Sequence, residues 1–121
     1  MERKFDLDER LINFAVAIID ISEILPKSFA GNHIACQLVR CGTSPALNYG
    51  EAQSAESRND FIHKMKISAK ELRETFSCLR IINRKNWHSE EKLLPVLDEN
   101  NQLISIFVKS IETAKKNNGL K

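Results

Sequence analysis

The chain has 121 residues, which is enough for one domain and too few for two separate hydrophobic cores. Hydrophobic residues make up 42% and charged residues 28%, the range of a soluble globular protein, and four glycines with three prolines are too few turn formers for an all-β protein. The net charge of +2 permits an anionic or a neutral partner, so the positions of the charges must decide between them.

The first predicted helix covers residues 7–25. Asp6 followed by Glu9 resembles a capping box, and Pro26 ends the helix because it has no backbone N–H group. One apolar stripe has the 4-3-4-3-4 spacing of a packed helix: Leu7, Leu11, Phe14, Ile18, Ile21 and Leu25. Four more apolar residues lie off this stripe: Ile12, Val16, Ile19 and Ile24. A helix that is apolar on more than one side needs more than one neighbour, which indicates self-association.

The second predicted helix covers residues 33–56, with Asn32 as its N-cap. Pro45 lies inside it and cannot donate a hydrogen bond to the Cys41 carbonyl, so we expect a kink there. Asn48 follows one turn later as a polar side chain directed at the core, where its amide fixes the packing register. The alternative is a ligand or ion site at the broken turn, but no cluster of chemical groups supports it.

The third predicted helix covers residues 58–85. Ser57 with Asp60 forms a second capping box at its start. Its core stripe again has helical spacing: Ile62, Met65, Ala69, Leu72, Phe76 and Leu79. The tight turn before this helix predicts that it runs back along the second helix as an antiparallel neighbour.

The antiparallel arrangement of the second and third helices predicts ion pairs along their polar margins. The register places Arg40 opposite Glu71 or Glu74. It also places Glu51 near His63 and Lys64. These pairs are expected to hold the two helices together.

The fourth predicted helix covers residues 90–116. It begins near Ser89, with acidic residues in its first turn, or closer to Pro95, which suits a first turn. Its apolar stripe is Leu93, Leu97, Ile104, Phe107, Ile111 and Ala114. Three apolar residues lie outside this stripe: Leu103, Ile106 and Val108. The outer helices thus share a surplus of apolar surface.

These elements predict an all-α, antiparallel up-down four-helix bundle with a Pro-kinked second helix, formed by residues 1–121 as a single domain. The surplus apolar residues of its first and last helices are the predicted oligomer interface: Ile12, Val16, Ile19, Leu103, Ile106 and Val108.

Cofactor and metal chemistry find no support in the residues. The three cysteines Cys36, Cys41 and Cys78 have no CxxC spacing and no histidine partner nearby in sequence, so we expect reduced core thiols without a metal or cofactor. The N-terminus has no apolar signal region, and the run from Leu11 to Ile19 is about half of a bilayer span. We therefore expect a soluble cytoplasmic protein that does not enter a membrane.

Three segments together carry a family resemblance: RCGTSPALNYGEA over residues 40–52, SRNDF over 57–61 and KELRET over 70–75. They resemble the four-helix bundle proteins encoded by intervening sequences in bacterial 23S ribosomal RNA genes. They are also similar to the accessory variability determinant proteins of diversity-generating retroelements. The residues at motif positions have an expected structural role in joining the second and third helices: Arg40, Ser44, Pro45, Asn48, Glu51, Arg58, Asp60, Glu71 and Glu74.

The resemblance implies a barrel-like homopentamer, which agrees with the surplus apolar surface. For the retroelement proteins it implies a basic barrel that binds nucleic acid and a reverse transcriptase. For the ribosomal members it implies no defined biochemical activity. The shared motif does not separate the two branches.

A basic stripe along the third helix is the candidate nucleic-acid-binding site. Its members are spaced 4, 3, 7 and 4 residues apart along about 27 Å of one helix flank: Lys66, Lys70, Arg73, Arg80 and Arg84. Such a row matches the footprint of a protein that neutralises phosphates without reading sequence. The alternative is a solvated face paired with Glu71 and Glu74. Because no aromatic residues are interleaved, base stacking is not expected.

Arg58 and His63 form an Arg-x4-His pattern that looks like the active-site motif of HEPN ribonucleases. The pattern coincides with the start of the third helix, and no other catalytic cluster accompanies it. We therefore favour a non-enzymatic accessory or scaffold protein that binds RNA or another nucleic acid. The alternatives are a purely structural homo-oligomer and a HEPN-like ribonuclease.

Overall fold

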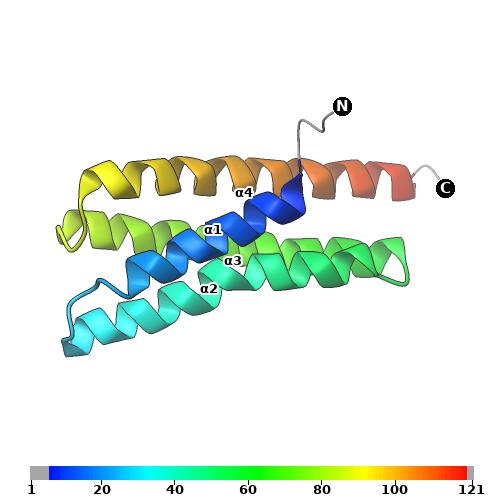
Figure 1. The fold of residues 1–121 in the computed structure, drawn as a ribbon. Helices are drawn as coiled ribbons and strands as arrows, with labels where there is room; N and C mark the ends of the chain where they lie inside the picture. Colours follow the sequence, from blue (N-terminus) through cyan, green and yellow to red (C-terminus); the bar gives the residue numbers. More distant parts are fainter. Residues whose placement is uncertain (1–5, 120–121) are drawn as a thin grey trace.

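The computed structural model describes residues 6–119, and the ends of the predicted domain, 1–5 and 120–121, lie outside the described residues. The described chain forms four helices, α1 (Leu7–Ser22), α2 (Phe29–Gln53), α3 (Arg58–Arg84) and α4 (Glu90–Gly119), and contains no strand. Figure 1 shows α3 running antiparallel to α2 on one side and to α4 on the other, while the shorter α1 crosses the bundle obliquely. The prediction of an all-α four-helix bundle is confirmed.

Two of the predicted helix caps are present. The Asp6 carboxylate accepts a hydrogen bond from the Glu9 backbone N–H at 3.2 Å, and the Ser57 hydroxyl accepts one from the Asp60 N–H at 3.0 Å. Each bond satisfies one of the amide groups that the first turn of a helix leaves without an internal partner. The starts of α1 and α3 therefore follow from local sequence.

The predicted start of the second helix at residue 33 is wrong. Ser28, and not Asn32, caps α2, and its hydroxyl accepts a hydrogen bond from the Gly31 N–H at 3.0 Å. A Cβ atom at position 31 would overlap the Pro26 carbonyl oxygen, so only glycine lets the helix begin beneath the preceding loop. The helix thus starts four residues early because of a close packing contact that the sequence pattern does not show.

The other helix ends differ from prediction by a few residues. Helix α1 ends at Ser22 rather than at residue 25, and the next residues form tight turns, with the Ile24 N–H donating to the Ile21 carbonyl at 3.1 Å. Helix α2 ends at Gln53 rather than at residue 56, and α4 continues to Gly119. The α2 helix runs through the buried Pro45 without a break, and the kink stays a prediction.

One hydrophobic core fills the space between the helices. The predicted α1 stripe is buried in full, and the α3 stripe is buried except for Phe76, which is half-buried. Four of the six residues of the predicted α4 stripe are buried, and the stripe departs from the observed core in its middle, where Leu103 is fully buried and Ile104 only partly. Leu103 therefore belongs to the core of its own chain, and its prediction as an interface residue is wrong.

The buried amide of the core belongs to Asn100, not to Asn48. The Asn100 side chain has no exposed surface, and its Nδ2 donates to the Leu72 carbonyl at 3.0 Å. Asn48 is half-buried and donates to the Ser44 hydroxyl within α2 at 2.8 Å. Asn100 occupies an inward position of α4, so its polarity interrupts the apolar pattern next to Leu103, where the predicted stripe departs from the observed core.

The four helices do not pack against one another to the same extent. Helix α3 packs along both α2 and α4, and α1 packs mainly on α2 and has few contacts with α4. The two outer helices are joined at their margin by Arg10, whose guanidinium donates to the Glu99 carboxylate at 2.7 Å and 2.9 Å. Apolar surface therefore remains on α1, where Ile12, Val16 and Ile19 are 43%, 52% and 38% exposed.

Two glycines of α2 offer a matched test of this packing. A Cβ at position 42 would lie 2.7 Å from Ile18 Cγ2, whereas one at position 50 would meet nothing within 4 Å in the described chain. Both alanine substitutions gain the same helix propensity, so their difference isolates overpacking. We expect Gly42→Ala to be less stable than Gly50→Ala by about 1–3 kcal/mol in urea denaturation. Equal stabilities would contradict the close contact between α1 and α2.

Candidate nucleic-acid interface

Arg40 of α2 binds both acidic residues on the neighbouring flank of α3. Its guanidinium donates to the Glu71 carboxylate at 3.2 Å and to the Glu74 carboxylate at 3.2 Å, which confirms the predicted pairing. The Glu74 hydrogen bond and the Glu71 charge raise the pKa of Arg40, so it stays a cation. Both carboxylates of this flank are thereby occupied by a residue from another helix.

A second ion pair joins α2 and α3 nearer the turn between them. The Lys64 ammonium lies 3.7 Å from the Glu51 carboxylate and 3.7 Å from that of Asp60 one helical turn away. This confirms the expected proximity of Glu51 and Lys64. The two helices are thus linked at two levels along their shared margin.

The five predicted phosphate-binding cations lie exposed on α3, and none of them enters an ion pair within residues 6–119. The ion pairs of the described chain involve other cations, namely Arg10, Arg40 and Lys64. The alternative hypothesis required Glu71 and Glu74 to neutralise the stripe, but both bind Arg40. The stripe therefore faces solvent as uncompensated positive charge.

Part of this stripe borders a shallow groove between α3 and α4. Lys66 and Arg73 line it together with Lys115, over a floor that includes Val108, and its volume is about 370 Å³. One carboxylate, Glu112, also lines the groove. The sequence analysis missed Lys115 as a member of this cluster, although the antiparallel register of α3 and α4 contained the signal.

The other end of the stripe borders a second hollow on α3 itself. Arg80 and Arg84 line it with Ser77 and Ile81, and its volume is about 210 Å³. Ile81 is 46% exposed, so the lining of this hollow includes apolar surface beside the two arginines. Lys70 lies outside the linings of both hollows and is exposed.

Arg58 and His63 do not form an enclosed site. Both side chains are exposed on the first turns of α3, where Ser57 caps the helix. An exposed pair on one helix lacks the water-excluding surroundings that strengthen transition-state stabilisation. The geometry of the single chain thus gives the ribonuclease hypothesis no support.

The three thiols differ in their surroundings. Cys36 is exposed, so its prediction as a core thiol is wrong, whereas Cys41 is buried and Cys78 half-buried. Cys78 donates a hydrogen bond to Cys41 and, with Thr75, lowers the pKa of Cys41 to about 7, while the pKa of Cys78 is raised. Among residues 6–119, no three His, Cys, Asp or Glu residues lie close enough together to hold a metal ion.

Comparison with known proteins defines the class of this molecule. The chain matches the model of the 23S rRNA-intervening sequence protein family over residues 3–109, so it belongs to that family. None of the described helices combines the length and apolar character needed to cross a membrane.

One solved structure is similar over nearly the whole chain. It is a protein of unknown function from the S23 ribosomal protein family of Bacteroides thetaiotaomicron VPI-5482, with 27% sequence identity and a TM-score of 0.81. The match covers 88% of this chain and 98% of that one. A search of curated proteins gave no match. Neither the family model nor this structure concerns the retroelement accessory proteins, so that resemblance stays a prediction.

The exposure of the thiols predicts their reactivity. Although the pKa of Cys41 near 7 favours its thiolate at pH 8, burial blocks access to the sulfur, so accessibility decides the rate. With Ellman's reagent we expect one rapid thiol in the native protein and three after unfolding. Cys36→Ser should remove the rapid phase. Two or more rapid thiols in the native wild type would contradict this packing.

Proposed function

We propose that this protein is a non-enzymatic, oligomeric accessory or scaffold protein of the cytoplasm that binds RNA along the basic flank of α3. One observation carries the proposal: Glu71 and Glu74 bind Arg40, and the five stripe cations have no ion pair among the described residues. Uncompensated cations in a row attract phosphates by releasing the counterions that surround a nucleic acid. The contact is with the backbone, so DNA is the other nucleic acid that the site accepts.

The stripe favours contact without sequence recognition. Lysine and arginine side chains neutralise phosphates, whereas reading of single-stranded bases requires stacking on aromatic rings. The flank of α3 presents no interleaved aromatic residue, and its apolar members in the two hollows are aliphatic. The groove between α3 and α4 adds Lys115 to Lys66 and Arg73, so the phosphate-binding surface extends beyond one helix.

Self-association supports the same function by multiplying weak contacts. The exposed Ile12, Val16 and Ile19 of α1 favour coverage by a second copy, and the half-buried Ile106 and Val108 of α4 complete the proposed interface. The proposals that the oligomer is a homopentamer and that a reverse transcriptase is a partner rest on the family resemblance alone. Repetition of the basic stripe in an oligomer raises affinity through multivalency.

A purely structural homo-oligomer is the second candidate function. The same exposed apolar residues of α1 favour it, because they need no nucleic acid to explain them. The two functions differ in what the charges of α3 do. They are therefore separated by charge reversal on α3 and not by measurement of the oligomer.

Charge reversal on the stripe provides the test. We expect Lys66→Glu with Arg73→Glu and Arg80→Glu to weaken binding of a single-stranded RNA strongly in fluorescence anisotropy. Removal of three phosphate contacts also lowers the slope of log K against log salt by about 2. The matched control reverses three exposed cations outside both hollows, Arg58→Glu with Lys109→Glu and Lys116→Glu, and should retain most binding.

Equal loss in both triple variants would show that net charge, and not the α3 flank, governs binding. No binding by the wild-type protein would favour the purely structural oligomer. Cleavage of the RNA that is lost in His63→Ala with binding intact would instead support the ribonuclease.

A further inference from the structure

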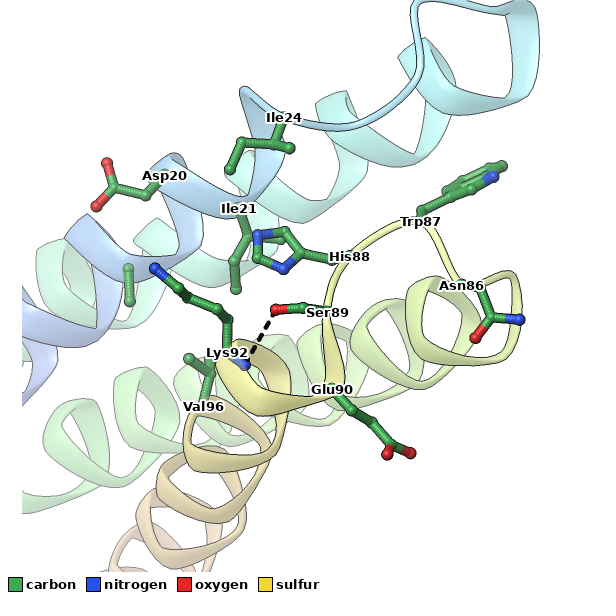
Figure 2. A pocket seen from close by; sticks show the side chains of 11 residues that line it. Asp20, Ile21, Ile24, Asn86, Trp87, His88, Ser89, Glu90, Lys92 and Val96 are labelled. Carbon is green, nitrogen blue, oxygen red and sulfur yellow. Dashed lines mark hydrogen bonds between the residues drawn. The ribbon is translucent and has the colours of Figure 1, made fainter.

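A hollow of the described chain lies between the C-terminal part of α1 and the connection from α3 to α4, and nothing in the proposed RNA site uses it. Its volume is about 790 Å³, and apolar side chains from both outer helices line it, including Ile21, Ile24 and Val96. Figure 2 shows the His88 ring below Ile24 and beside Ile21. The hollow exists because α1 and α4 have few contacts with each other.

The rim of this pocket carries charge of both signs with an excess of acid. Asp20 and Glu90 line it together with a single ammonium group, that of Lys92. Figure 2 shows the Lys92 side chain reaching toward the α1 side of the pocket. A pocket of this size has room for an aromatic side chain together with neighbouring residues of its own segment, and the acidic residues of its rim favour an accompanying cation.

Such a side chain lies elsewhere on the same chain. Phe29 is the first residue of α2 and is 92% exposed, the highest value among the exposed large hydrophobic residues of the described chain. It does not line the pocket of its own chain, and Lys27 stands two residues before it, also exposed. The chain therefore carries an exposed aromatic side chain, Phe29, which we call the knob, and an apolar pocket, which we call the hole. Within one copy the knob does not enter the hole.

We propose that Phe29 of one copy inserts into this pocket of the next copy, with Lys27 facing the acidic rim. The proposal rests on the self-association proposed above and names the contact that produces it. The knob and the hole are different surfaces, so the interface is heterologous and each copy uses both of them with two different neighbours. Repetition of such a contact generates a ring when the rotation closes.

The position of the two features favours a ring whose copies point the same way. Figure 1 shows the start of α2 and the connection from α3 to α4 at the same end of the bundle. Parallel neighbours in a ring bring these two levels together, whereas an antiparallel pair would place them at opposite ends. The basic stripes of α3 would then also run parallel in the assembly.

The test removes the knob and fills the hole separately. In analytical ultracentrifugation at micromolar concentration, Phe29→Ala and Ala17→Trp should each weaken self-association by about 30-fold or more, as loss of an interface anchor does. Ala17 lines the pocket. Leu47→Ala is the matched control, because Leu47 is 71% exposed on the same helix and lies outside the pocket, and it should assemble like the wild type.

Mixing the two defective variants gives the sharpest result. Phe29→Ala retains an intact pocket and Ala17→Trp retains an intact Phe29, so an equimolar mixture should form 1:1 heterodimers and no ring. If Ala17→Trp fails to fold by circular dichroism, Ile24→Lys replaces it, because Ile24 is 63% exposed and lines the pocket, and a cation there also repels Lys27. An oligomeric wild type with an unchanged Phe29→Ala would overturn this contact and leave the proposed function standing. A monomeric wild type would overturn both the contact and the oligomeric part of the proposed function.

Discussion

The ion pairs from Arg40 to Glu71 and Glu74 determine which charges of α3 remain without an ion pair in the described chain. They join α2 to α3 at the margin of the core, and the Lys64 pairs repeat the link nearer the turn. Exposed ion pairs contribute little to folding free energy, so their larger effect is on the distribution of charge. By binding both carboxylates of one α3 flank, Arg40 leaves the cations of the other flank facing solvent without an ion pair in the described chain.

The incomplete closure between α1 and α4 gives the molecule a second, apolar surface. The exposed isoleucines of α1, the pocket at its C-terminal part and the exposed Phe29 all lie away from the α3 stripe and share no residue with it. Self-association through these residues does not compete with RNA binding, whereas Val108 belongs both to the proposed interface and to the groove beside Lys66 and Arg73. An assembly of parallel copies would instead bring several weak phosphate-binding stripes together, which suits a scaffold better than an enzyme.

The sequence was sufficient where structure depends on local chemistry or on helical spacing. The caps at Asp6 and Ser57, the α1 stripe and the pairing of Arg40 with α3 were all predictable. Prediction from the sequence failed where packing between helices, and not helical spacing, decides which residues are buried. Asn100 holds an inward position through its hydrogen bond to the Leu72 carbonyl, so a search for apolar residues chose Ile104 for the core and misassigned Leu103. The α3–α4 groove with Lys115 and the pocket near Ile24 depend on contacts between separate helices.

The most direct measurement is to map where bound RNA touches the protein. Ultraviolet cross-linking of a single-stranded RNA to the wild-type protein, followed by mass spectrometry of the peptides, locates the contact without any substitution. Our account predicts adducts within residues 66–84 of α3 and around Lys115 of α4, where the uncompensated cations lie. Adducts confined to α1 and α2, or no adduct under conditions of saturating RNA, would contradict it.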